Sequence, residues 1–128
     1  DMAFHKFLKA VIYDEAIPVY VDVLQTREFT YLSDAVAANL AAATVDDAVG
    51  EIFNIGGGSR VVLKEVLETM EEIVGKPIKR NHIEKAMGDA RHTAADVSKA
   101  KKILGYQPQV SLREGLTKEW EWVKGIYC

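Results

Sequence analysis

Apolar residues recur every three or four positions in five stretches of the chain, which is the spacing of one face of an α-helix. The predicted helices cover about residues 3–14, 34–43, 63–74, 96–104 and 112–123. The clearest stripe lies in the third stretch and consists of Leu63, Val66, Leu67, Met70, Ile73 and Val74. Gly75 and Pro77 stand where that helix should stop. Ser33, Asp96 and Ser111 stand where N-caps are expected.

Short apolar stretches with turn residues beside them alternate with these helices and predict four strands. Their ranges are Ile17–Val21, Arg27–Leu32, Glu51–Ile55 and Ile78–Ile83. Strands that alternate with helices indicate the α/β class. We therefore expect residues 1–128 to form one small mixed domain of short strands and about five helices. Because so few short strands make a thin sheet, we also expect the chain to be a piece of a longer protein.

Composition narrows the classes of function. The chain has 128 residues, 48% of them hydrophobic and 27% charged, which is typical of a single globular domain. A net charge of −3 without a basic stripe argues against nucleic acid as a partner. No apolar run approaches the roughly 18–20 residues that span a membrane. One cysteine, Cys128, excludes an intrachain disulfide and fits a reducing compartment, so we expect a cytoplasmic protein.

Three consecutive glycines, Gly56 to Gly58, follow the predicted strand Glu51–Ile55 and precede a helical pattern. A dinucleotide-binding loop needs Gly-x-Gly-x-x-Gly and an acidic residue about 20 positions later. Gly56 and Gly58 match the first two places, but Val61 occupies the third and no suitable acid follows. The glycines therefore predict a strand-to-helix turn, and no cofactor is expected on this chain.

Other candidate chemistry is sparse. Arg27, at the start of a predicted strand, fits either a surface salt bridge or an anion ligand. His5, His82 and His92 do not have metal-ligand spacing with Cys or acidic partners, so no metal site is predicted. No local pattern indicates a nucleophile with its base, and we predict no catalytic residue.

Six blocks, taken in order along the chain, resemble one known family. They are MAFHKFLKA, IPVY, QTREFTYLSDAVAAN, EIFNIGGGSRVVLKEVLE, GDARHTAADVSKAKKILGY and VSLREGLTKEWEW. The series is similar to the C-terminal part of the extended short-chain dehydrogenase/reductases. Within that group it resembles the NAD-dependent nucleotide-sugar epimerases of the UDP-glucose 4-epimerase type.

The resemblance implies a division of labour between two parts of such an enzyme. The N-terminal Rossmann half carries the NAD fingerprint and a catalytic Tyr-x-x-x-Lys pair, and none of the five tyrosines here begins that motif. We therefore expect this chain to be the substrate-binding portion, with NAD held by the other half and no turnover by the chain alone. The expected partners are a UDP-sugar and either the Rossmann half or another copy of the chain, as a homodimer.

The resemblance also assigns roles to five residues. Arg27 matches the arginine that pairs with the diphosphate, and Tyr20 the aromatic residue beside the uracil. Leu63 matches an apolar contact to that base, Asp89 the acid that binds the ribose hydroxyls, and Thr93 a residue that sets the width of the sugar pocket.

Four positions depart from the family pattern. Val21 and Val23 stand where glycines are usual, Ala86 where a second phosphate arginine is usual, and Val62 where a serine N-cap is usual. These departures leave two alternatives open beside the epimerase. One is a related dehydratase or decarboxylase, and the other is a non-catalytic module that self-associates, with Glu51–Ile55 as an orphan strand that pairs between chains.

Overall fold

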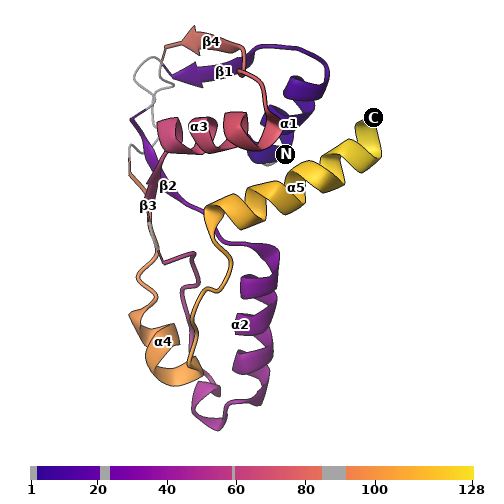
Figure 1. The fold of residues 1–128 in the computed structure, drawn as a ribbon. Coiled ribbons are helices and arrows are strands. Elements are labelled where there is room, and N and C mark those ends of the chain that lie inside the picture. Colours follow the sequence, from indigo (N-terminus) through magenta and orange to yellow (C-terminus); the bar gives the residue numbers. More distant parts are fainter. Residues whose placement is uncertain (1–2, 21–23, 59, 85–91) are drawn as a thin grey trace. The chain divides into compact units, whose positions relative to one another are not determined.

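The computed structural model describes residues 3–20, 24–58, 60–84 and 92–128, which form two compact units (Figure 1). The helices are α1 (Ala3–Ile12), α2 (Leu32–Thr44), α3 (Leu63–Val74), α4 (Ser98–Leu104) and α5 (Leu112–Tyr127), with a 3₁₀ turn, η1 (Asp46–Ala48). The strands are β1 (Ile17–Tyr20), β2 (Thr26–Glu28), β3 (Arg60–Val62) and β4 (Arg80–Ile83). Five helices and short strands confirm the predicted α/β class.

The first unit comprises residues 1–25, 62–91 and 112–128 and contains α1, α3 and α5. β1 and β4 form a parallel pair in which Ile17 lies opposite Arg80 and Tyr20 opposite Ile83. Large apolar side chains fill its core, and the fully buried ones are Leu8, Ile17, Val66, Leu67, Met70, Leu116 and Val123. Three of these lie on the stripe that predicted α3, so the helical pattern is the core-facing surface of that helix.

The end of α3 follows the prediction. Gly75 takes the left-handed conformation, with φ of 79°, and its N–H donates to the carbonyl of Glu71. The Glu71 carboxylate then accepts the N–H of Ile78 at 3.0 Å and the guanidinium of Arg80 at 2.8 Å, which joins the helix end to β4. At the other end of α3, Val62 is the N-cap and makes no side-chain capping bond, as its apolar side chain predicts.

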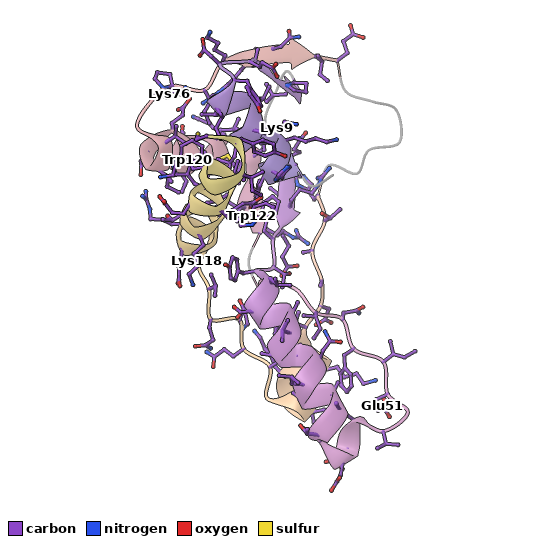
Figure 2. The ribbon with its side chains drawn as sticks, turned by 90° about the vertical axis from the view of Figure 1, so that its right-hand side faces the viewer. Lys9, Glu51, Lys76, Lys118, Trp120 and Trp122 are labelled. Atoms are coloured by element: carbon purple, nitrogen blue, oxygen red, sulfur yellow. The ribbon has the colours of Figure 1, made fainter. Side chains whose placement is uncertain are left out.

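The two tryptophans of α5 differ in exposure. Trp120 is half-buried, whereas Trp122 is 58% exposed and its ring centroid lies 5.6 Å from that of His5 (Figure 2). α5 therefore covers the unit with one face and presents aromatic surface on the other.

The second unit comprises residues 26–61 and 92–111 and contains α2, η1 and α4. β2 pairs with β3, whose first two residues belong to this unit. Its core is built from smaller side chains, namely Ala38, Ala48, Val97, Ala100, Leu104 and Tyr106, against which Phe53 and Ile55 pack. Asp34 in the first turn of α2 is also buried, at 4% exposure, and its carboxylate accepts the N–H groups of Gln109 and Val110 at 3.0 and 3.2 Å.

The start of α2 corrects the expectation that Ser33 is an N-cap. The helix begins at Leu32, Tyr31 is the N-cap, and no side chain makes a capping bond. Asp34 anchors this helix end instead, through a contact with a segment 75 residues away that local sequence cannot reveal. α4 likewise begins at Ser98, although Asp96 Oδ1 does accept the Ser98 N–H at 2.9 Å, as a capping side chain should.

The segment Glu51–Ile55 corrects a second expectation, because residues 51–57 have no regular secondary structure. The alternation that predicted a strand is nevertheless present, since Phe53 and Ile55 pack on the core while Ile52 is 83% exposed. A strand requires a neighbour that completes its hydrogen-bond ladder, and none of the described residues pairs with this segment. The glycines are also followed by β3 rather than directly by a helix, and β2 is shorter than the predicted Arg27–Leu32.

Candidate functional site

β2 is the element around which candidate site residues gather in the second unit. Side chains alternate along a strand, so Thr26 and Glu28 point to one face and Arg27 to the other. Arg27 is half-buried, and its Nη1 donates to the carbonyl of Thr26 at 2.9 Å. This bond turns the guanidinium back along its own strand.

The segment that begins at His92 lies beside β2. His92 and Thr26 form a parallel bridge, and the N–H of Thr93 donates to the carbonyl of Thr26 at 3.3 Å. The Thr26 hydroxyl and His92 Nδ1 are hydrogen-bonded at 2.8 Å. Arg27 and Thr93, which the sequence separates widely, are thus brought to adjacent backbone segments of one unit.

Glu28 joins β2 to two loops. Its Oε1 accepts the N–H of Gly58 and its Oε2 accepts the N–H of Ala95, each at 2.5 Å. Hydrogen bonds to a carboxylate are shorter and stronger than those between neutral groups. The two loops are therefore fixed to the strand by one side chain.

A cavity of about 430 Å³ opens beside this side chain in the second unit. It is lined by Glu28, Thr30, Asn54, Ile55, Gly56 and residues 93–96. Thr93 is the predicted site residue in this lining, and Arg27 lies on the opposite face of β2. The cavity and the arginine are therefore neighbouring features on the same strand.

The glycine turn is shaped by close approach to the end of β2. A Cβ added at Gly56 would lie 2.6 Å from Glu28 Oε1, and one at Gly57 would overlap the carbonyl oxygen of Phe29. The Gly58 N–H, which a cofactor loop would present to a phosphate, donates instead to a carboxylate that would repel one. The turn is thus held by contacts within the second unit, and the absence of a cofactor from it remains a prediction.

Tyr106 fixes the same turn from the core side. Its buried hydroxyl donates to the carbonyl of Gly56 at 2.7 Å. Burial raises the pKa of Tyr106 above its ordinary value, and the negative charges of Asp34 and Glu28 raise it further. The phenol therefore stays protonated and keeps donating. Asp96 is exposed and belongs to the cavity lining, and the hydrogen bonds from Ser98 lower the pKa of its carboxylate, which therefore stays ionised.

The other predicted residues fall elsewhere. Tyr20 ends β1 and Leu63 begins α3, both in the first unit, and the Leu63 N–H donates to the carbonyl of Gln25 at 3.0 Å. Asp89 lies outside the described residues, as do the departures Val21, Val23 and Ala86. The structure thus brings Arg27 and Thr93 together within the second unit and describes Tyr20 and Leu63 in the first.

Sequence reasoning missed Thr26, His92 and Glu28. Their roles depend on contacts between segments about 30 to 67 residues apart, as the Glu28 bonds to Gly58 and Ala95 illustrate. The run of polar residues around Arg27 was the local signal. It indicated the strand, but it could not identify the distant residues to which Thr26 and Glu28 hydrogen-bond.

Two further observations concern metal binding and membrane insertion in the part of the chain that the structure describes. In them, no His, Cys, Asp or Glu side chains cluster in threes as a metal site requires. No helix in the same ranges combines the length and the apolar composition needed to cross a bilayer.

Comparison with known proteins finds relatives in the family that the six sequence blocks resemble. The model of the NAD dependent epimerase/dehydratase family matches residues 2–56. The uncharacterized UDP-glucose epimerase YtcB of Bacillus subtilis is 36% identical over 127 residues, which are 99% of this chain and 40% of that protein. UDP-glucuronic acid decarboxylase 5 of Arabidopsis thaliana is 36% identical over 110 residues, covering 86% of this chain and 32% of that protein.

A solved structure extends the match to the fold. The crystal structure of UDP-glucuronic acid 4-epimerase from Bacillus cereus, in complex with UDP-glucuronic acid and NAD, has a TM-score of 0.93 and 36% identity over 99% of this chain and 41% of that one. The chain thus spans about 40% of the length of such relatives. It belongs to the NAD-dependent epimerase/dehydratase family, and it corresponds to the C-terminal part of the nucleotide-sugar epimerases in that family.

Proposed function

We propose that this chain is the substrate-binding part of an NAD-dependent UDP-sugar 4-epimerase and holds the nucleotide diphosphate. The observation that carries the proposal is the placement of Arg27 on β2, beside the backbone of His92 and Thr93, while the opposite face of the same strand borders a cavity that Thr93 lines. An arginine and a small hydroxyl residue on adjacent segments suit a ligand with a phosphate group next to a sugar.

Arg27 would pair with the diphosphate. The planar guanidinium presents a fixed fork of N–H donors, which suits two oxygens at once in a way that a lysine ammonium does not. Tyr20 and Leu63 would contact the uracil, Asp89 the ribose hydroxyls, and Thr93 the sugar. Firm hold on the nucleotide would leave the sugar free to turn and present either face.

The redox chemistry would come from NAD, which would be bound by the part of the full-length enzyme that lies outside the region this chain corresponds to. NAD supplies hydride acceptance from the sugar carbon and hydride return to it. This chain's own contribution is to bind and orient the nucleotide, since its tyrosines lack the Tyr-x-x-x-Lys spacing. Alone, it would not turn over a UDP-sugar.

A decarboxylase of UDP-glucuronic acid is a second candidate, because a plant enzyme of that name has the same 36% identity to this chain, over 110 residues, as the UDP-glucose epimerase has over 127. The two activities use the same class of nucleotide-sugar and would place the same demands on Arg27. They differ in products: with UDP-glucuronic acid, a decarboxylase releases carbon dioxide, whereas an epimerase yields a sugar of unchanged mass. Mass spectrometry of products from an enzyme that contains this chain together with a catalytic half separates them.

The binding proposal is tested by titrating the chain with UDP by calorimetry. We expect weak binding that Arg27→Ala abolishes, and that Arg27→Lys restores only in part because an ammonium offers no planar fork. Loss of a charge-assisted contact of this kind is worth about 1.5–3 kcal/mol, or roughly ten- to hundredfold in affinity.

Arg60→Ala is the matched control, because Arg60 is an exposed arginine on β3, the strand that pairs with β2. It should leave UDP affinity unchanged. A wild-type chain that shows no heat with millimolar UDP contradicts the proposal, and so does equal binding by the wild type and Arg27→Ala.

A further inference from the structure

The carboxylate of Glu28 is the side-chain group that links the parts of the candidate site in the second unit. Each of its oxygens accepts one backbone N–H, from Gly58 on one side and from Ala95 on the other, at 2.5 Å. The donors belong to the glycine turn and to the loop that lines the cavity. One side chain therefore fixes the distance between two loops that have no regular secondary structure.

Thr26 secures the same loop two residues earlier on β2. Its carbonyl accepts the Thr93 N–H, and its hydroxyl is hydrogen-bonded to His92. The loop is thus held at residues 92 and 93 by Thr26 and at residue 95 by Glu28. Thr93 is thus attached to Thr26 through its own N–H and lies two residues before the Glu28 attachment, so the course of the loop around it depends on both.

The environment favours a role in positioning rather than in ligand contact. The carboxylate oxygens already accept N–H groups, and a negative charge beside a diphosphate would weaken its binding. Gly56 packs so closely that a Cβ there would lie 2.6 Å from Glu28 Oε1, and Tyr106 holds the Gly56 carbonyl from the other side. The glycine turn is therefore shaped to receive this carboxylate.

We propose that Glu28 is a positioning residue for the nucleotide-sugar site, which fixes the loop of residues 93–95 and the glycine turn on the strand that carries Arg27. The proposal rests on the proposed function and deepens it. Its specific consequence concerns the sugar: Glu28 sets where Thr93 lies, so it should affect the binding of a UDP-sugar more than that of UDP.

The test compares UDP-glucose and UDP as ligands of the wild type and Glu28→Gln. Glutamine keeps the shape, but it presents an NH₂ donor where one of the two N–H groups needs an acceptor. We expect Glu28→Gln to weaken UDP-glucose binding by about tenfold, the lower end of the loss seen when a residue that orients a metal ligand is replaced. UDP binding should weaken clearly less. Glu51→Gln is the control, because Glu51, labelled in Figure 2, is an exposed carboxylate of the same unit. Its partner is Lys99, and its replacement should change neither affinity.

Amide NMR spectra report on the contact itself. In the wild type, the Gly58 and Ala95 amide protons should resonate downfield, as protons bonded to a carboxylate do, and they should move upfield in Glu28→Gln while signals from α2 stay in place. If those two signals move and both ligands bind as they do to the wild type, the positioning role is wrong. Equal losses for UDP and UDP-glucose also contradict it, because they indicate a general loss of structure.

Ala95→Pro provides a second route should Glu28→Gln fail to fold. It deletes the N–H that Glu28 Oε2 accepts and leaves the carboxylate and its bond to Gly58 intact. The same preferential loss of UDP-glucose is expected, and wild-type affinity for both ligands would overturn the proposal. A wild-type chain that binds neither ligand defeats the proposed function itself, which is a different result from unchanged affinities in the variants.

Discussion

The interior of the first unit and the interior of the second unit are stabilised by different interactions. All seven of the largest fully buried side chains are apolar and lie in the first unit, on α1, β1, α3 and α5. The second unit has a core with three alanines, and its segments are joined by Asp34, Glu28 and Tyr106, which hydrogen-bond to backbone groups far away in sequence. Apolar packing therefore defines the first unit, while directed polar contacts define the one that carries Arg27 and Thr93.

This difference matters for a binding site. Apolar packing tolerates a range of side chains of similar volume, whereas a hydrogen bond fixes the distance and direction between two groups. A unit whose loops are set by carboxylate-to-backbone bonds can hold polar ligand-binding groups at defined separations.

The largest expected effect tests the apolar side of the comparison. Leu67 on α3 is fully buried, so Leu67→Ala should lower the free energy of unfolding by about 2–5 kcal/mol through lost burial and the cavity left behind. Urea denaturation measures it. In the second unit, Val97→Ala removes less side chain from a smaller core, and its cost should be about 1–2 kcal/mol. If Leu67→Ala and Val97→Ala lower the free energy of unfolding by similar amounts, apolar packing does not distinguish the two units.

A carboxylate variant tests the polar side. Asp34→Ala leaves the N–H groups of Gln109 and Val110 without their acceptor, and we expect the free energy of unfolding to fall by about 1.5–3 kcal/mol. Asp47→Ala changes an exposed carboxylate of the same unit and should stay within about 0.5 kcal/mol of the wild type. Urea denaturation of both variants makes the comparison, and an Asp34 variant as stable as the Asp47 variant would show that the buried carboxylate contributes little.

The smallest expected effect is a dependence on alkaline pH. The pKa of Tyr106 is raised above its ordinary value of 10.0 by burial and by nearby carboxylates, so the folded protein keeps the proton to higher pH than the unfolded chain does. The contribution of the protonated Tyr106 to the free energy of unfolding is fully present below pH 10, and it is lost as the pH rises through the pKa that Tyr106 has in the folded protein. Tyr106→Phe should remove this part of the decline when urea midpoints are measured from pH 8 to 11. An identical decline in that variant would assign the effect to other groups.

The same comparison explains which features the sequence could predict. The stripe from Leu63 to Val74 and the stop at Gly75 are local, and the structure confirms both. The start of α2, the end of β2 and the bonds of Glu28 depend on partners far along the chain, and local pattern could not locate them. Ile52 shows the limit most clearly: its alternation with Phe53 predicts a strand, yet a strand also needs a neighbour, and that information does not reside in the segment itself.

For the site, the sequence indicated Arg27 and Thr93 through a resemblance, and the structure brings their backbones together. The roles assigned to all five residues, Arg27, Thr93, Tyr20, Leu63 and Asp89, remain predictions. Glu28 could not be singled out in advance, because nothing in the sequence distinguishes it from the other acidic residues on short polar runs.

The crowding at the glycine turn has a consequence for how sequences of this kind are interpreted. A Cβ added at Gly57 would overlap the backbone carbonyl oxygen of Phe29, so substitution there should be strongly destabilising whether or not a cofactor is bound. At Gly56 the added carbon would meet the end of the Glu28 side chain and would displace that carboxylate from its bonds to Gly58 and Ala95. The lack of space for a Cβ is thus a sufficient reason for a glycine at such a position. Three consecutive glycines are therefore not by themselves evidence of a phosphate-binding loop.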